Sequence, residues 1–216
     1  MFGDGTDGAA GIQFGADNGG VEVTNYLVDL VANPNFVVDN NNEVALGLMK
    51  EGKCDAFFSG TWKAQAAMEA LGENYAAAQL PCITLNGQEC QLKSFSGSKA
   101  FAANPNSANM KAAVALAAWL GSAEMQDLHF DLRNGEVVPC ATSLLSNEKF
   151  SANPAAVAQN DTIANTSKLQ PSIPEMGNYW ANAGAMGTSL ANGEINEANA
   201  LEKTNTWNDG LNNSGL

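Results

Sequence analysis

Residues 45–62 read ALGLMKEGKCDAFFSGTW, a stretch that predicts a helix, a turn and a buried strand in succession. Apolar residues at helical spacing precede Gly52, and glycine commonly ends a helix. The short apolar run at 54–60 predicts a buried strand that delivers Trp62 beyond its carboxyl end. Ligands of open α/β sheets bind outside the carboxyl ends of the strands, so Trp62 is a candidate binding residue.

Outward from this stretch, helical and extended segments alternate along the chain. Apolar residues at helical spacing, or helix-start signals, predict further helices at 21–31, 62–71, 107–120, 154–169, from Pro174 onward and beyond Gly193. Residues 75–83 and the stretch after Gly87 are expected to be extended, with a turn between them. The sequence therefore predicts an α/β architecture with helical packing towards the C-terminus.

The charge of the chain excludes some classes of partner. Its 216 residues carry 10 basic and 23 acidic side chains, a formal net charge of -13, and Arg133 is the only arginine. Nucleic acids and anionic membrane surfaces are held by clustered Lys and Arg, so neither is an expected partner. No apolar run approaches the roughly 20 residues of a transmembrane helix.

Four cysteines and a single histidine give little support for a metal site. Cys54, Cys82, Cys90 and Cys140 show no C-x-x-C spacing and His129 stands alone, so neither a metal nor a cofactor is expected. Cys82 and Cys90 flank ITLNGQE, and a three-residue loop at 85–87 would place them opposite each other. A hairpin disulfide and two reduced thiols both remain open.

The first residues, MFGDGTDGAAG, contain no recognisable export signal. They lack the basic start, the apolar run and the cysteine that secretion and lipid attachment require. The segment reads like the middle of a longer protein, and Met1 is not taken as its natural start.

Four stretches together resemble one known family. They are VTNYLVDLVANPN (23–35), ALGLMKEGKCDAFFSGTW (45–62), the segment GSKAFAANPNSANMKAAVALAAWLGSAEMQDLHFD (97–131) and LQPSIPEMGNYWANAGAMGTSLANGEINEANAL (169–201). In this order they resemble bacterial extracellular solute-binding proteins of the maltose/maltodextrin type. A G-x-W alone is uninformative, but followed by P-x-I-P-E-M-x-x-x-W it is specific.

The resemblance implies a periplasmic-binding-protein-like fold with two lobes, of which this chain holds an incomplete set. Residues 1–92 would belong to the C-terminal lobe, residues 93–145 to a returning segment of the N-terminal lobe, and residues 146–216 to C-terminal lobe helices. It further implies sugar uptake with the membrane permease subunits of an ABC transporter. The location would be extracellular, as a cell-surface lipoprotein or a periplasmic protein.

A sugar site needs a flat aromatic surface beside directional hydrogen-bonding groups, because a pyranose has a C–H face and a rim of hydroxyls. Trp62 and Trp180 match tryptophans that the family uses for stacking. Tyr179 is expected either to stack or to donate its hydroxyl, and Glu175 either to accept hydrogen bonds or to be an ordinary first-turn residue. Trp119 and Trp207 are expected in the core.

One departure bears on the choice of sugar. In the maltose-specific pattern a tyrosine and an arginine follow the second tryptophan, but here Ala181 and Gly184 occupy those places. The aromatic surface is retained and polar groups are lost, which argues against maltose itself.

Two other functions are weighed against sugar transport. A glycoside hydrolase needs two carboxylates about 5–10 Å apart, and the only acids near the tryptophans are Asp55 and Glu175. His129 has no partner in a nucleophile motif, so triad hydrolysis is also poorly supported. A non-transport module that binds polysaccharide would instead show an exposed aromatic strip.

Overall fold

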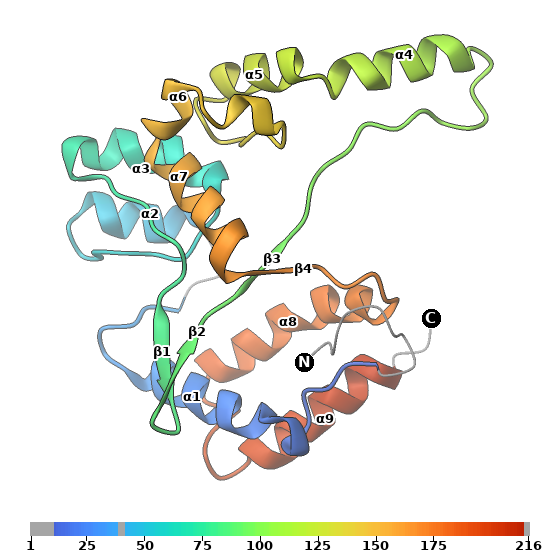
Figure 1. Cartoon of the computed structure of the whole chain (residues 1–216). Coiled ribbons are helices and arrows are strands. Elements are labelled where there is room, and N and C mark those ends of the chain that lie inside the picture. Colours follow the sequence, from blue (N-terminus) through green and yellow to red (C-terminus); the bar gives the residue numbers. More distant parts are fainter. Residues whose placement is uncertain (1–10, 39–41, 214–216) are drawn as a thin grey trace. The chain divides into compact units, whose positions relative to one another are not determined.

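A computed structural model describes residues 11–38 and 42–213 of the chain (Figure 1). The expectation about an export signal concerns residues 1–10, which lie outside the described part. The described residues fall into two compact units, each with elements from distant parts of the sequence. Unit 1 draws on Met1–Asn40, Cys82–Gln91 and Leu169–Leu216, and unit 2 on Asn41–Pro81 and Leu92–Lys168. The lobe boundaries expected from the sequence concern the complete protein and stay a prediction.

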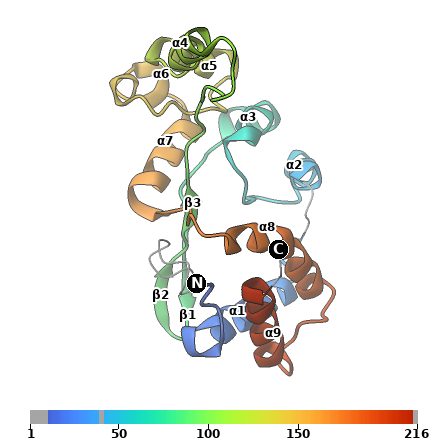
Figure 2. The same cartoon turned by 90° about the vertical axis from the view of Figure 1, so that its right-hand side faces the viewer.

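Unit 1 is built mainly from three helices, which lie side by side in both views (Figure 2). Its elements are the 3-10 turn η2 (Ala16–Asn18), α1 (Gly20–Ala32), the strands β1 (Cys82–Leu85) and β2 (Gln88–Gln91), α8 (Glu175–Ala191) and α9 (Ala200–Asn213). Helix α1 covers the run whose spacing predicted it. Asn33, which follows α1, is extended because it precedes Pro34, and a residue before proline is pushed out of the helical region.

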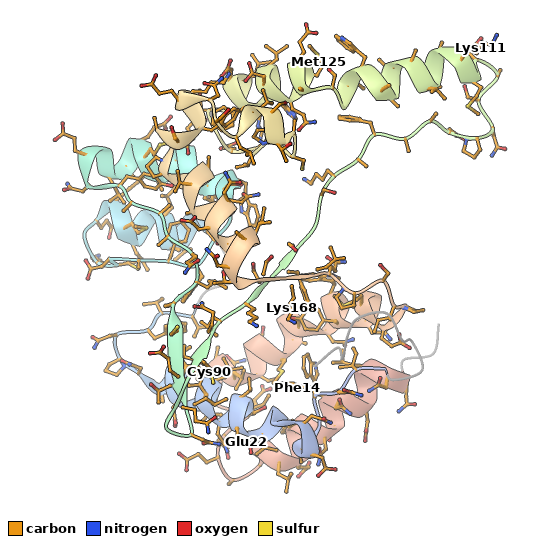
Figure 3. The ribbon with its side chains drawn as sticks, viewed as in Figure 1. Phe14, Glu22, Cys90, Lys111, Met125 and Lys168 are labelled. Atoms are coloured by element: carbon orange, nitrogen blue, oxygen red, sulfur yellow. The ribbon has the colours of Figure 1, made fainter. Side chains whose placement is uncertain are left out.

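The core of unit 1 joins the first described residues to the last helix. Ile12, Phe14 and Leu211 are buried together, and Tyr179 and Trp207 pack against them. Phe14 points into this cluster (Figure 3) and meets the Trp207 ring edge-on, with centroids 5.0 Å apart. The expectation that Trp207 packs against the core is confirmed.

Three asparagines of α9 satisfy the backbone of the segment at 12–16. The side-chain oxygens of Asn212, Asn208 and Asn205 accept from the N–H groups of Ile12, Phe14 and Ala16, at 2.7, 2.7 and 3.1 Å respectively. The Asn212 amide also donates to the Ile12 carbonyl at 2.8 Å. Side chains three and four apart share one helix face. The asparagines on this face of α9 therefore accept hydrogen bonds from the backbone of the segment, as a neighbouring strand would.

A buried hydroxyl pair ties α1 to α9. Thr24 and Thr204 are both fully buried, and their Oγ atoms lie 2.7 Å apart. The Thr24 hydroxyl donates to the Gly20 carbonyl at 2.9 Å. Because a hydroxyl has one proton, Thr204 must be the donor between the two threonines.

We predict that Thr24→Val destabilises unit 1 by about 1–3 kcal/mol, because it leaves the Thr204 hydroxyl buried without a partner. The double variant Thr24→Val/Thr204→Val should lose less than the sum of the two single variants, since both polar groups are then removed. Urea unfolding followed by tryptophan fluorescence measures both effects. Thr206→Val, at an exposed position of the same helix, is the control. Additive losses in the double variant would contradict the coupling.

The hairpin corrects the expected loop by one residue. Asn86 and Gly87 both have positive φ (50° and 76°), as the central residues of a two-residue type I′ turn require. Leu85 therefore pairs with Gln88, Ile83 with Cys90 and Cys82 with Gln91. Neighbouring residues of a strand face opposite sides of the sheet, so Cys82 and Cys90 are not cross-strand partners. All four cysteines, each in the described part of the chain, are free thiols.

Unit 2 consists of short helices connected by long irregular segments. Its elements, in chain order, are α2 (Asn42–Lys50), η3 (Thr61–Lys63), α3 (Ala64–Leu71), η4 (Gly72–Asn74), β3 (Ser94–Ser96), α4 (Met110–Leu120), α5 (Ala123–Leu132), η5 (Thr142–Leu144), α6 (Glu148–Ser151), α7 (Pro154–Asp161) and the π turn η6 (Thr162–Thr166). Strand β4 (Ser167–Leu169), which pairs with β3, lies at its boundary. Helix α7 is shorter than predicted, because the chain passes through the π turn into β4.

The core of unit 2 is aromatic and is flanked by one cation. Phe130, Phe150 and Ala156 are buried together, and the two phenylalanine rings are 4.2 Å apart. The Lys149 ammonium forms ion pairs with Asp127 and Asp131 at 2.7 and 2.8 Å. Hydrogen bonds to these two carboxylates raise the pKa of Lys149. The cluster fastens α5 to α6 and α7.

Two expectations in unit 2 are wrong. Residues 54–60, predicted as a buried strand, form no strand, and Phe58 is exposed. A buried strand needs hydrogen-bonded neighbours, and within the described residues the only sheets are two strand pairs formed elsewhere. Trp119, expected in the core, is 51% exposed on α4, a helix with no buried residue. Apolar residues surround almost the whole of α4, and Lys111 is its only charged side chain (Figure 3).

Across residues 11–38 and 42–213, no helix combines the length and apolar character needed to cross a bilayer.

Candidate functional site

The Trp62 side chain stands on the short turn η3, directly before α3. It is 61% exposed although it is the largest kind of apolar side chain. Its ring folds back over Gly60: a methyl group built on Gly60 would overlap three atoms of the six-membered ring, Cε3, Cζ3 and Cη2. The indole is therefore both exposed and held against the backbone two residues earlier.

Two polar contacts hold the same turn. The Thr61 hydroxyl donates to the Glu136 carbonyl at 2.7 Å, which joins the turn to a segment 75 residues away in sequence. Lys63 forms an ion pair with Glu43 of α2. The hydrogen bond and charge of Lys63 lower the pKa of the Glu43 carboxyl. The residues on either side of Trp62 therefore both make contacts that restrict the turn.

Trp180 lies in the second turn of α8 and is 56% exposed. Its ring meets Tyr179 edge-on with centroids 5.2 Å apart, and Tyr179 meets Trp207 at 6.2 Å. Since Trp207 contacts Phe14 in the core, four aromatic rings lead from the interior of unit 1 to its surface. Trp180 is the exposed end of this series.

Tyr179 belongs more to the core than to the surface. It packs against the cluster of Ile12, Phe14 and Leu211, and burial raises the pKa of its phenol above the ordinary value of 10.0. Of the two roles expected for Tyr179, a face-stacking surface is the less compatible with this packing. Its use as a sugar contact stays a prediction.

Glu175 is the first residue of α8, and one of its carboxylate oxygens, Oε2, is buried with no hydrogen-bond partner among the described residues. A carboxylate oxygen accepts hydrogen bonds. Glu175 therefore has unused capacity to accept from a hydroxyl group.

The candidate residues divide between the two units. Trp62 belongs to unit 2, whereas Glu175, Tyr179 and Trp180 lie within the first two turns of α8 in unit 1. The structure brings the last three together on one helix. That Trp62 and Trp180 face one shared ligand stays a prediction.

Unit 1 also has a hollow of about 420 Å³ between α8 and α9. Its lining includes Met186, Glu194, Lys203 and Trp207, but neither Tyr179 nor Trp180. This hollow is therefore separate from the exposed face of Trp180. No group of three or more His, Cys, Asp or Glu residues suited to a metal ion occurs within the described parts of the chain.

Sequence reasoning missed the residues that hold Trp62. Gly60 and Thr61 were noted only as members of the G-x-W pattern, and neither the overlap at Gly60 nor the bond to Glu136 leaves a signal in the sequence. It also missed Phe58, which is exposed four residues before Trp62. Its position in an apolar run had suggested burial.

The chain belongs to the bacterial extracellular solute-binding protein family, which it matches over residues 2–159. The galactooligosaccharide-binding protein of Bacillus subtilis (strain 168) is 27% identical over 189 residues, covering 88% of this chain and 43% of that protein. A maltooligosaccharide ABC transporter solute-binding lipoprotein of Streptococcus pneumoniae serotype 4 is 30% identical over 131 residues, covering 61% and 29%. These matches confirm the resemblance drawn from the four stretches.

Two solved structures share the fold. One, whose description includes "with acarbose", is 46% identical, with a TM-score of 0.91, and covers 99% of this chain and 56% of that one. The maltodextrin binding protein MalE1 from L. casei BL23, without ligand, is 22% identical, with a TM-score of 0.71, over 95% of this chain and 57% of that one. This second likeness concerns the fold alone. The chain thus spans about half the length of these two proteins, and its fold is periplasmic-binding-protein-like.

We predict that replacing the two neighbouring aromatics of α8 changes stability by very different amounts. Tyr179→Ala removes a ring packed on the core and should destabilise unit 1 by about 2–4 kcal/mol. Trp180→Ala removes a mostly exposed ring and should change stability by less than about 0.5 kcal/mol. Urea unfolding monitored by circular dichroism distinguishes them. A large loss with Trp180→Ala would show that its ring is structural.

Proposed function

We propose that this chain contributes to the binding of an oligosaccharide, maltodextrin-like in kind, for uptake by an ABC transporter. The observation that carries the proposal is the exposure of two indole rings, each attached to a structured support. Trp62 is held by Gly60 and the η3 turn, and Trp180 by the aromatic series from the core. An exposed indole presents a flat apolar face to solvent, and the C–H face of a sugar is a suitable cover for it.

The relatives support the same class of ligand. The Bacillus subtilis relative is named for galactooligosaccharide binding and the Streptococcus pneumoniae relative for maltooligosaccharide transport. The 46% identical structure is described with acarbose. The ligands named differ among these proteins, and Ala181 and Gly184 offer no polar group of their own beyond the backbone. The proposal therefore names oligosaccharides as a class and not maltose.

In this proposal the protein is a binding component and not an enzyme. Its relatives carry binding and transport names, and the two acids considered for glycoside hydrolysis, Asp55 and Glu175, form no paired acidic motif in the sequence. Glu175 instead accepts a hydrogen bond from a sugar hydroxyl. The membrane permease subunits of an ABC importer are the proposed protein partners. The complete protein acts outside the cytoplasmic membrane, as a cell-surface lipoprotein or a periplasmic protein.

We predict that this 216-residue chain binds malto-oligosaccharides weakly, with a dissociation constant near 1 mM. Each stacked aromatic contributes about 0.5–1.5 kcal/mol beyond area burial, and each hydrogen bond about 1 kcal/mol. A dissociation constant of 1 mM requires about 4 kcal/mol, which a few such contacts supply. Isothermal titration calorimetry with maltose, maltotriose and maltotetraose measures it.

Variants of the same chain separate stacking from non-specific binding. Trp62→Ala and Trp180→Ala should each weaken maltotetraose binding by about three- to tenfold. Trp119→Ala, which removes an exposed indole outside the proposed site, should leave the affinity unchanged. Equal losses for all three variants, or no heat with any sugar in the series, would refute the proposed function.

A further inference from the structure

We propose that Gly60 and Thr61 are positioning residues, which fix the Trp62 indole in place before any ligand arrives. The proposal rests on the proposed function, since it treats Trp62 as a stacking surface for sugar. It adds that the η3 turn holds the Trp62 ring in its binding position in advance. Neither residue needs to touch the ligand.

The first observation is the space above Gly60. One face of the six-membered indole ring, near atoms Cε3, Cζ3 and Cη2, occupies the volume in which any larger residue would place its β-carbon. The backbone of Gly60 has φ −113° and ψ 176°, an extended conformation open to every residue. Glycine is therefore required here for space and not for its backbone freedom.

The second observation is the hydrogen bond that anchors the turn. Thr61 is partly buried, and its hydroxyl donates to the Glu136 carbonyl at 2.7 Å. This bond connects η3 to the segment that follows α5, so the turn cannot rotate without breaking it. The residue between the glycine and the tryptophan thus fixes the direction in which the backbone delivers the ring.

The two contacts restrict the Trp62 side chain in different ways. The Thr61 bond restricts the backbone, and the space above Gly60 accepts one face of the ring. An indole that rests one face on the glycine keeps its opposite face available for the C–H face of a sugar. Because the ring is already ordered, binding does not have to immobilise it, and a preorganised group loses less entropy on association.

The ring position can be tested without any sugar. The 216-residue chain labelled with 5-fluorotryptophan contains four tryptophans, and its ¹⁹F NMR spectrum should show one resonance for each, with that of Trp62 assigned by its loss in Trp62→Phe. Gly60→Ala should displace the Trp62 resonance and leave the other three in place. The three unchanged signals also show that the variant is folded. Gly97→Ala is the matched control, because a β-carbon there meets nothing within 4 Å.

The threonine is tested by a pair of variants. Thr61→Val removes the donor and should displace or broaden the Trp62 resonance, whereas Thr61→Ser keeps the hydroxyl and should restore the position of the original chain. A purely structural role of Thr61 would disturb the other three resonances instead. An unmoved Trp62 signal in both Gly60→Ala and Thr61→Val would overturn the proposal.

Titration of the same samples with maltotetraose links position to binding. We expect Gly60→Ala and Thr61→Val to weaken binding by about three- to tenfold, and Gly97→Ala and Thr61→Ser to leave it unchanged. If the Trp62 resonance moves but the affinity does not, the positioning proposal is overturned and the proposed function stands. If the original chain shows no response to sugar while Gly60→Ala still displaces the ring, the proposed function fails and the steric role of Gly60 is supported.

Discussion

The strip of asparagines on α9 is the constraint on which unit 1 depends. Asn205, Asn208 and Asn212 satisfy backbone N–H groups at residues about 190–200 positions earlier. With them the N-terminal segment lies on the last helix and the core of Phe14, Leu211 and Trp207 closes. The hydrogen bond between Thr24 and Thr204 adds a second polar connection, between α1 and α9. Because a buried backbone group without a partner is costly, hydrogen bonding as well as apolar contact holds the segment at 12–16 to α9.

The same core supports the candidate site on α8. Tyr179 is packed on the aromatic cluster, and the next residue, Trp180, is carried out to the surface. A stacking residue on a helix that is fixed from below moves less than one on a free loop, and less ordering is then left to binding. Trp62 reaches a comparable result by another route, through a glycine that gives it room and a threonine that anchors its turn. The two proposed platforms thus depend on local supports of different kinds.

Helix α4 differs from these packed elements. It is apolar on nearly every side, yet none of its residues is buried, and Val114, Leu116 and Trp119 are all exposed. A helix that is hydrophobic all round is normally found inside a large protein. The chain spans about half the length of the solved proteins that share its fold.

Much of the secondary structure could be predicted from sequence, because helical spacing and terminators are local signals. The helices α1, α2, α4 and α8 lie where the apolar spacing and the glycine and proline positions indicated. The Asn86–Gly87 turn was recognised, but its length was misjudged, because the two-residue form depends on both φ values being positive. The burial of 54–60 and Trp119 was misjudged for a different reason. Whether a residue is buried depends on which other parts of the chain pack over it, and the local sequence pattern does not show that packing.

The sequence by itself determined the family, the acidic charge that argues against nucleic acid as a partner, and the identity of the two tryptophans proposed to bind sugar. These depend on residue type and order, which tertiary contacts do not alter. Only the tertiary structure decided that Tyr179 packs on the core while Trp180 is exposed, and that Gly60 and Thr61 hold Trp62. The physical reason is that these contacts connect residues far apart in sequence, or depend on volumes that exist only after the chain has folded. A glycine and a threonine carry no sign of such a role until the indole and the Glu136 carbonyl are beside them.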